Sequence, residues 1–158
     1  MNKFEKISAR RFSADISDKC AYDDIKLPVR ATKNSAGYDF FAPFDFTLAS
    51  GESIKVPTGI RVLLDDDKVL LIAPRSGLGF KYRLQLDNTL GVVDADYSGS
   101  DNEGHIFIKI TNDSKEGKTL SVKKGEAFAQ GIIVQFFKTV DDNATEERNG
   151  GFGSTNKK

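Results

Sequence analysis

Apolar side chains alternate with polar ones in short runs along the chain, and glycine, asparagine, aspartate or lysine separates the runs. The clearest run spans residues 54–64, where aliphatic residues alternate and Pro57-Thr58-Gly59 forms a turn between two strands. Further short strands are expected at 69–72, 106–110 and 132–137. Because strand side chains point alternately to the two faces of a sheet, this pattern predicts half-buried antiparallel strands. Many short strands with glycine-rich turns favour an all-β, jelly-roll-like distorted barrel.

Helical periodicity is rare, and we expect one short helix over residues 78–84, after Ser76-Gly77. At 158 residues the chain fits one domain. Residues 1–140 are predicted to form this β domain. Residues 141–158 are polar, charged and glycine-rich, with Phe152 as their one large apolar residue, which predicts a mobile C-terminal arm.

The charge balance excludes a strong overall field, because 23 lysine and arginine residues face 23 aspartate and glutamate residues. Attraction to nucleic acid or an anionic membrane is therefore not expected, and any bound phosphate must be held by local groups. No apolar run approaches the ~20 residues of a membrane span. The single Cys20 cannot form an internal disulfide, and the N-terminus lacks the apolar run of a signal peptide, so we expect a cytoplasmic protein.

Three segments carry groups suited to chemistry. Residues 74–78 (Pro-Arg-Ser-Gly-Leu) follow a predicted strand, where free backbone N–H groups and the Arg75 guanidinium suit phosphate oxygens. A surface turn with a solvated arginine explains the same residues. Residues 148–155 combine a cation, glycines, an aromatic ring and two hydroxyls, although a glycine-rich tail with an incidental Phe152 is the alternative.

The third segment, residues 94–104, resembles part of a calcium-binding loop, with acidic and small residues at its first, third, fifth and sixth positions. The twelfth position is His105 instead of a bidentate glutamate, and strands are predicted on both sides, so calcium binding is not expected. The competing interpretation is a hairpin from Leu84 to Asp94 that delivers an aspartate able to orient a water. A solvated hairpin turn remains open from the residues alone.

In order, five segments resemble the motifs of the trimeric dUTP diphosphatase family, and they extend over most of the chain. They are Ala36-Gly37-Tyr38-Asp39-Phe40, the segment 74–78, the segment 91–99, Gly125-Glu126-Ala127-Phe128-Ala129-Gln130 and the segment 148–155. The resemblance implies a homotrimer that hydrolyses dUTP to dUMP and pyrophosphate with Mg²⁺. This activity limits uracil in DNA and supplies dUMP for thymidylate synthesis.

The resemblance also implies residue roles. Asp94 is the catalytic residue that activates a water for attack on the α-phosphorus, and Tyr97 lies under the deoxyribose and excludes a 2′-hydroxyl. Phosphates are held by Arg75, Ser76, Gly77 and Gln130. Uracil is bound by Asn88, Val92 and Val93. Asp39 reaches magnesium through water. The arm closes over the substrate through Arg148, Phe152, Gly153, Ser154 and Thr155.

Departures from the family pattern include an insertion-like segment at 101–104 and the position of Arg148, one residue nearer the phenylalanine than in many members. A dCTP deaminase would share the fold, but Lys109 stands where its catalytic glutamate is expected. A non-catalytic trimer that binds nucleotide or a regulatory protein is the other alternative. We expect His105 to be a partly exposed residue without a special function, like Cys20 and the acidic turn 65–68.

Overall fold

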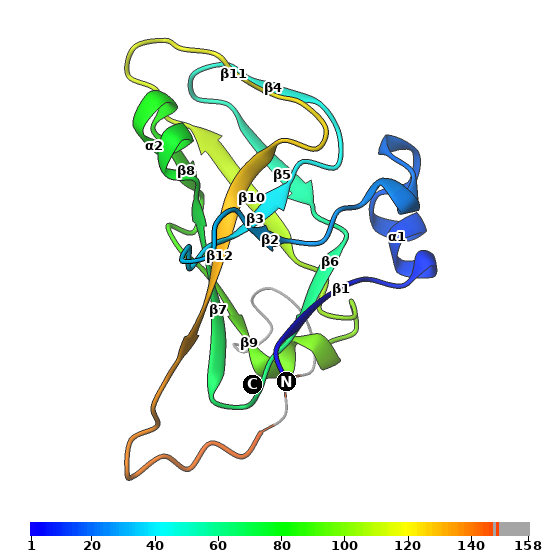
Figure 1. Ribbon diagram of the computed structural model, residues 1–158, viewed down its shortest axis with the longest axis vertical. Helices are drawn as coiled ribbons and strands as arrows, with labels where there is room; N and C mark the ends of the chain where they lie inside the picture. The colour runs from blue at the N-terminus through cyan, green and yellow to red at the C-terminus, as the bar shows by residue number, and fades with distance from the viewer. Residues whose placement is uncertain (147, 149–158) are drawn as a thin grey trace.

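Antiparallel strands dominate the computed structural model, which describes residues 1–146 and 148 (Figure 1). The two short helices are α1 (Ala9–Asp15) and α2 (Ser76–Tyr82), and 3₁₀ turns cover Ser17–Lys19, Tyr22–Asp24 and Ala95–Gly99. The strands are β1 (Lys3–Lys6), β2 (Val29–Arg30), β3 (Tyr38–Phe41), β4 (Phe46–Leu48), β5 (Ser53–Pro57), β6 (Ile60–Leu63), β7 (Lys68–Pro74), β8 (Leu84–Leu86), β9 (Gly91–Asp94), β10 (Phe107–Asn112), β11 (Leu120–Val122) and β12 (Ala127–Gln135). The predicted all-β class is confirmed.

The strands form four small sheets. The largest has the order β2-β3-β12-β7-β9, and the second has the order β5-β10-β8. The pairs β1-β6 and β11-β4 complete the set. Strand β10 illustrates why these sequences form half-buried strands, because Ile108 and Ile110 are buried while Lys109, between them, is exposed. The inward faces of the sheets meet in one apolar core that includes Phe40, Leu70 and Phe128.

The predicted strands are found with small shifts. Strands β5 and β6 meet at the Pro57-Thr58-Gly59 turn, as expected. Strand β12 begins earlier than predicted, at Ala127, and ends at Gln135. Phe136 and Phe137 therefore lie beyond it, on the extended segment that leaves the body of the molecule in Figure 1.

The prediction of a single helix was wrong. Helix α2 begins at Ser76 and ends at Tyr82, because Arg83 takes a left-handed conformation with φ of 51°. Helix α1 was not predicted. Its N-cap is Ser8, whose hydroxyl accepts a hydrogen bond from the Arg11 N–H at 3.1 Å, and Phe12 and Ile16, one turn apart, are buried against the core. Neither helix has the length and apolar character needed to cross a bilayer.

His105 is fully buried, at 0% exposure, so the prediction that it is partly exposed was also wrong. Its Nε2 accepts the Gly59 N–H at 2.9 Å, and its Nδ1 lies 2.6 Å from the Asp15 carboxylate. Since Nε2 must be an acceptor, the proton of the neutral ring sits on Nδ1 and is donated to Asp15. Burial lowers the pKa of His105; Asp15 opposes this, while Arg11 and Lys55 add to it.

Burial acts to raise the pKa of Asp15, but hydrogen bonds from His105 and Arg11 outweigh it and hold that pKa below its usual value. The pair is therefore a neutral imidazole that donates to an ionised carboxylate. It connects helix α1 to the start of β10, which lies far along the chain.

Candidate active site

The segment 84–94 reverses direction as predicted, but its two arms belong to different sheets. Strand β8 pairs with β10, whereas β9 pairs with β7. Because each arm forms its ladder with another strand, the space between the arms is not closed by a shared ladder. A planar molecule can enter such a gap and reach backbone polar groups on both sides.

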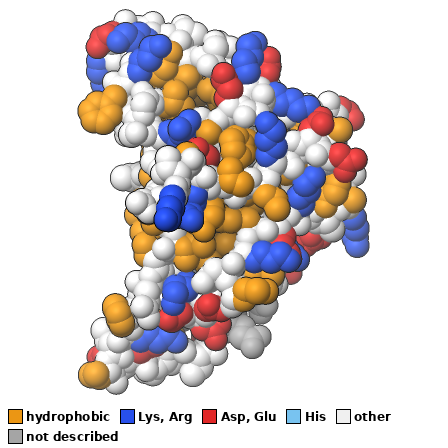
Figure 2. Space-filling view, in the orientation of Figure 1, with side chains coloured by type: hydrophobic (Ala, Val, Ile, Leu, Met, Phe, Trp, Pro, Cys, Tyr) orange, Lys and Arg blue, Asp and Glu red, His pale blue; other side chains and the backbone are white. Residues whose placement is uncertain are grey.

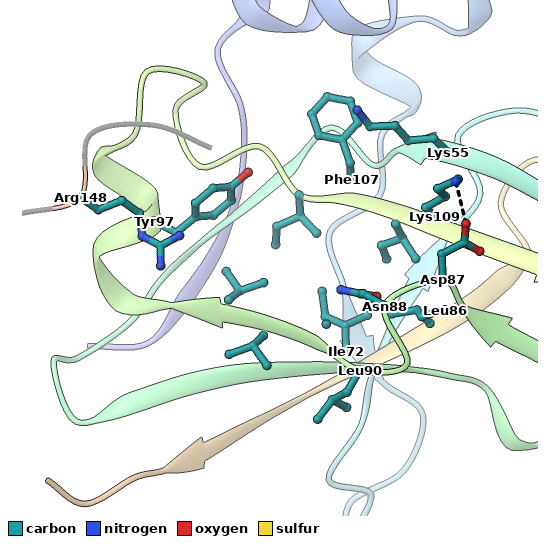
Figure 3. A pocket seen from close by; sticks show the side chains of 15 residues that line it. Lys55, Ile72, Leu86, Asp87, Asn88, Leu90, Tyr97, Phe107, Lys109 and Arg148 are labelled. Atoms are coloured by element: carbon teal, nitrogen blue, oxygen red, sulfur yellow. Dashed lines mark ion pairs between the residues drawn. The ribbon is translucent and has the colours of Figure 1, made fainter. Parts of the chain in front are cut away.

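This hairpin forms one wall of a cavity of about 560 Å³ (Figure 3). Its lining is mainly apolar and comes from the hairpin, from β10 and from the 3₁₀ turn after β9. Tyr97 and Arg148 lie at one end, while Lys109 and Asp87 form an ion pair of 2.7 Å at the other. Figure 2 shows hydrophobic side chains gathered near the middle of the visible face, with lysines and arginines around them.

Asp94 is the last residue of β9, and its side chain is 46% exposed. Nη2 of Arg148 binds its carboxylate, and Nε of Arg148 lies 3.1 Å from the carboxylate of Asp96. The guanidinium also lies over the ring of Tyr97, 5.8 Å from the ring centre. Arg148 thus joins the residues that were predicted to meet the α-phosphate and the sugar.

Tyr97 is 5% exposed, and its hydroxyl is used within the protein. The hydroxyl donates to the carbonyl of His105 at 2.9 Å and accepts a hydrogen bond from Nδ2 of Asn102 at 2.8 Å. Burial raises the pKa of Tyr97, so the phenol stays protonated at neutral pH. The ring, instead of the hydroxyl, is the part that the cavity presents to a ligand.

A second group of predicted residues gathers around the end of β7. Nε of Arg75 lies 3.2 Å from the carboxylate of Asp39, and Nε2 of Gln130 donates to the carbonyl of Pro74 at 3.2 Å. Asp39 and Gln130 are direct neighbours across the β3–β12 ladder. A methyl group added at Gly37 would lie 2.5 Å from Oε1 of Gln130, so only glycine leaves this amide in place. Ser76 starts helix α2 beside them.

The two groups are far apart within one chain. Asp94 is paired with Val69 at the start of β7, whereas Arg75 comes six positions later, just past the other end of the strand. At about 3.3 Å per residue, roughly 20 Å of strand separates them. A single chain therefore brings Tyr97, Asn88 and Arg148 together around the cavity, with Asp94 joined to them through Arg148, but it does not bring Arg75 to them.

The described carboxylates do not form a metal-binding cluster. Across residues 1–146 and 148, no three histidine, cysteine, aspartate or glutamate side chains converge on a point where they could hold an ion. Asp39, the predicted outer partner of magnesium, is 16% exposed and paired with Arg75. The predicted arm residues Phe152, Gly153, Ser154 and Thr155 lie outside the described residues.

Two residues beside the site were missed from sequence. Asn102 and His105 contact the hydroxyl of Tyr97, yet the sequence predicts Asn102 only as part of an insertion-like segment and His105 as a partly exposed residue. The run Asn102-Glu103-Gly104 does contain a turn signal. The partner of His105 is 90 residues away, and no local pattern reveals such a pair.

Comparison with known proteins agrees with the motif pattern. Residues 23–156 match the family model described as dUTPase. The deoxyuridine 5′-triphosphate nucleotidohydrolase of Lactococcus lactis is 40% identical over 134 residues, which cover 83% of this chain and 88% of the relative. The crystal structure of the dUTPase from Streptococcus mutans is 31% identical, covers 86% of this chain and 97% of its own, and superposes with a TM-score of 0.67.

A more distant structure has the same fold. It is a mutant dUTPase from phage phi11 of Staphylococcus aureus, which is 20% identical, with a TM-score of 0.66 over 92% of this chain and 97% of its own. That protein coordinates a structural Mg(II) ion. Five motifs in order, a family match over most of the residues and close relatives of nearly equal length agree: the chain belongs to the dUTPase family.

Proposed function

We propose that this protein hydrolyses dUTP to dUMP and pyrophosphate, by attack of water on the α-phosphorus. The observation that carries the proposal is the position of Asp94, a half-exposed carboxylate that pairs with Arg148, which lines one end of the apolar cavity together with the buried ring of Tyr97. A carboxylate there can accept a proton from a water while the ring supports a sugar. The reaction would keep uracil out of DNA and supply dUMP for thymidylate synthesis.

In this proposal the base enters the gap between β8 and β9. The Asn88 amide, which lies on the cavity wall, and backbone groups near Val92 and Val93 bind the uracil edge. The deoxyribose packs on the ring of Tyr97. Since the hydroxyl of Tyr97 is already paired with Asn102 and His105, the ring is held in place, and a 2′-hydroxyl would meet carbon where it needs a polar partner.

The phosphates are assigned to Arg75, Ser76, Gly77 and Gln130. Arg75 supplies charge-assisted hydrogen bonds, each contributing about 1.5 to 3 kcal/mol. Because about 20 Å separates Arg75 from Asp94 in one chain, a complete site needs Arg75 from a second copy. A homotrimer with three shared sites meets this need, and we adopt that assembly.

Magnesium is assigned to the substrate and not to a protein cage. The donor set fits such an ion, since Mg²⁺ retains waters and binds readily through phosphates with few carboxylates. Asp39, beside Arg75, is the residue that would reach its waters. When bound, the ion supplies neutralising charge on the phosphate oxygens.

Arg148 and the arm beyond it are assigned to closing the site over the substrate. Arg148 pairs with Asp94 and Asp96, and in this proposal phosphate oxygens replace these carboxylates as its partners. Phe152 is assigned to stack on uracil, with Gly153, Ser154 and Thr155 beside the terminal phosphate. Release of Arg148 from Asp94 would leave the carboxylate free to bind water.

One assay tests the activity. Pyrophosphate release is measured from dUTP, dCTP, dTTP and UTP, with Mg²⁺ or with EDTA. We expect strong release from dUTP alone, and only with the ion. Release from all four nucleotides, or deamination of dCTP, would contradict the proposal.

A mixing experiment tests the shared site. Arg75→Ala and Asp94→Asn proteins should each be nearly inactive. Unfolded together and refolded, they should regain part of the activity, because some sites combine the intact Asp94 of one variant with the intact Arg75 of the other. Two copies of the same variant, refolded alone, are the control. No regain on mixing would show that each chain builds its own site.

A further inference from the structure

Helix α1 and the turn 100–105 together form a support behind Tyr97, which we call the brace. Helix α1 belongs to residues 1–22, which precede the segment that matches the family model. These residues are well attached, because β1 pairs with β6 and Ile7, Phe12 and Ile16 are buried in the core.

Two polar contacts join α1 to the turn. The N–H and the hydroxyl of Ser8 donate to the Glu103 carboxylate at 2.8 and 2.7 Å. The carboxylate of Asp15 accepts the Nδ1 proton of His105, the last residue of the turn. Helix α1 and its N-cap therefore hold the turn at two residues, Glu103 and His105.

The turn 100–105 also holds Tyr97. Nδ2 of Asn102 donates to the Tyr97 hydroxyl, which donates to the carbonyl of His105. Oδ1 of Asn102 accepts the Gly104 N–H at 3.1 Å, so both ends of this amide are used. Gly104, with φ of 72°, packs so closely that an added Cβ would lie 2.7 Å from the Cα of Ser98. The phenol cannot shift unless these contacts break.

We propose that Asn102 and His105 are positioning residues for sugar selection, and that α1 keeps them in place through Ser8 and Asp15. They do not touch substrate; they act by fixing the ring of Tyr97, so that no space opens for a 2′-hydroxyl. This inference rests on the proposed function, which assigns the sugar to Tyr97. It makes sugar selection depend on residues that lie outside the five family motifs.

A double-mutant cycle tests the link through the hydroxyl. Asn102→Ala should raise the ratio of kcat/KM for UTP to that for dUTP by about 10-fold, which corresponds to the loss of one buried hydrogen bond. The same ratio for dCTP should stay constant, because the hairpin and not Tyr97 meets the base. Tyr97→Phe should have a similar effect, and Asn102→Ala should add nothing to it. Effects that multiply in the double variant would overturn the proposal.

The contribution of α1 is tested with Asp15→Asn, and Asp18→Asn provides an exposed control carboxylate in the neighbouring turn. Amide exchange of residues 97–105 should be faster in Asp15→Asn than in the control, and the UTP ratio should rise about 3-fold. Equal exchange in the two variants would overturn the role of α1. If the unaltered protein releases no pyrophosphate from dUTP, the proposed function fails, while amide exchange still decides whether the brace holds Tyr97.

Discussion

Gly104 offers a quantitative test of the packing behind Tyr97. Its φ of 72° lies in the left-handed region, where an alanine costs about 1 to 2 kcal/mol. In addition, the new Cβ would lie 2.7 Å from the Cα of Ser98 and 2.9 Å from the carbonyl oxygen of Tyr97. Both are backbone atoms that cannot rotate away, so overpacking adds about 1 to 3 kcal/mol. Gly104→Ala should therefore lower the free energy of unfolding by about 2 to 5 kcal/mol.

Gly117 is the matched control, because its φ is 67° and, apart from Gly117 itself and its two chain neighbours, no atom lies within 4 Å of the position of an added Cβ. Gly117→Ala has the backbone cost alone, about 1 to 2 kcal/mol. Subtracting the two values isolates the steric term, since the change in the unfolded chain is the same at both positions.

Urea unfolding followed by circular dichroism measures both variants. The protein concentration must be held constant, because association contributes to the stability of an oligomer. We also expect the UTP to dUTP ratio to rise in Gly104→Ala and not in Gly117→Ala, since the carbonyl of Tyr97 must move. Equal destabilisation by the two substitutions would refute the packing argument.

Four further outcomes are expected. Asp94→Asn should lower turnover by ~10² to 10⁴ while dUTP still binds, and near-normal kcat would remove Asp94 from the base role. Gly37→Ala should displace the amide of Gln130 and lower kcat/KM for dUTP about 10- to 100-fold in a folded protein, whereas unchanged kinetics would mean that this amide holds no phosphate. Burial lowers the pKa of His105, so the buried neutral ring contributes to the stability of the folded protein fully above about pH 6.5, and this contribution is lost as the pH falls through the pKa of His105 in the folded state. A urea midpoint that does not change between about pH 7.5 and pH 5 would contradict this. Deleting residues 147–158 should leave the unfolding temperature almost unchanged and abolish most turnover, and retained turnover would exclude the arm from the site.

Local patterns were sufficient to predict much of the fold. The alternation in residues 53–63 specifies two strands and their turn, because period-two burial needs no knowledge of the partner strand. Helix α1 escaped prediction since a seven-residue helix carries few buried positions, here Phe12, with Ile16 buried just after the helix ends. Its stability comes from tertiary packing, which the sequence does not display.

The same contrast between local and long-range information applies to the candidate site. The motif residues Asp94 and Arg75 could be picked out by family resemblance, but their separation by the length of β7 appears only when the ladder is known. The burial of His105 likewise depends on Asp15 and Gly59, both remote in sequence. The sequence thus singled out the residues that we assign to the substrate, but not the residues that hold them.

The pairing of Asp15 with His105 also has a consequence for folding. These residues are 90 positions apart, so their contact closes a long loop and carries a large entropic cost before any contact energy is gained. Such contacts form late and slow the approach to the native state. The region around Tyr97 should consequently acquire its final shape among the last steps of folding, after the chain as far as His105 has left the ribosome.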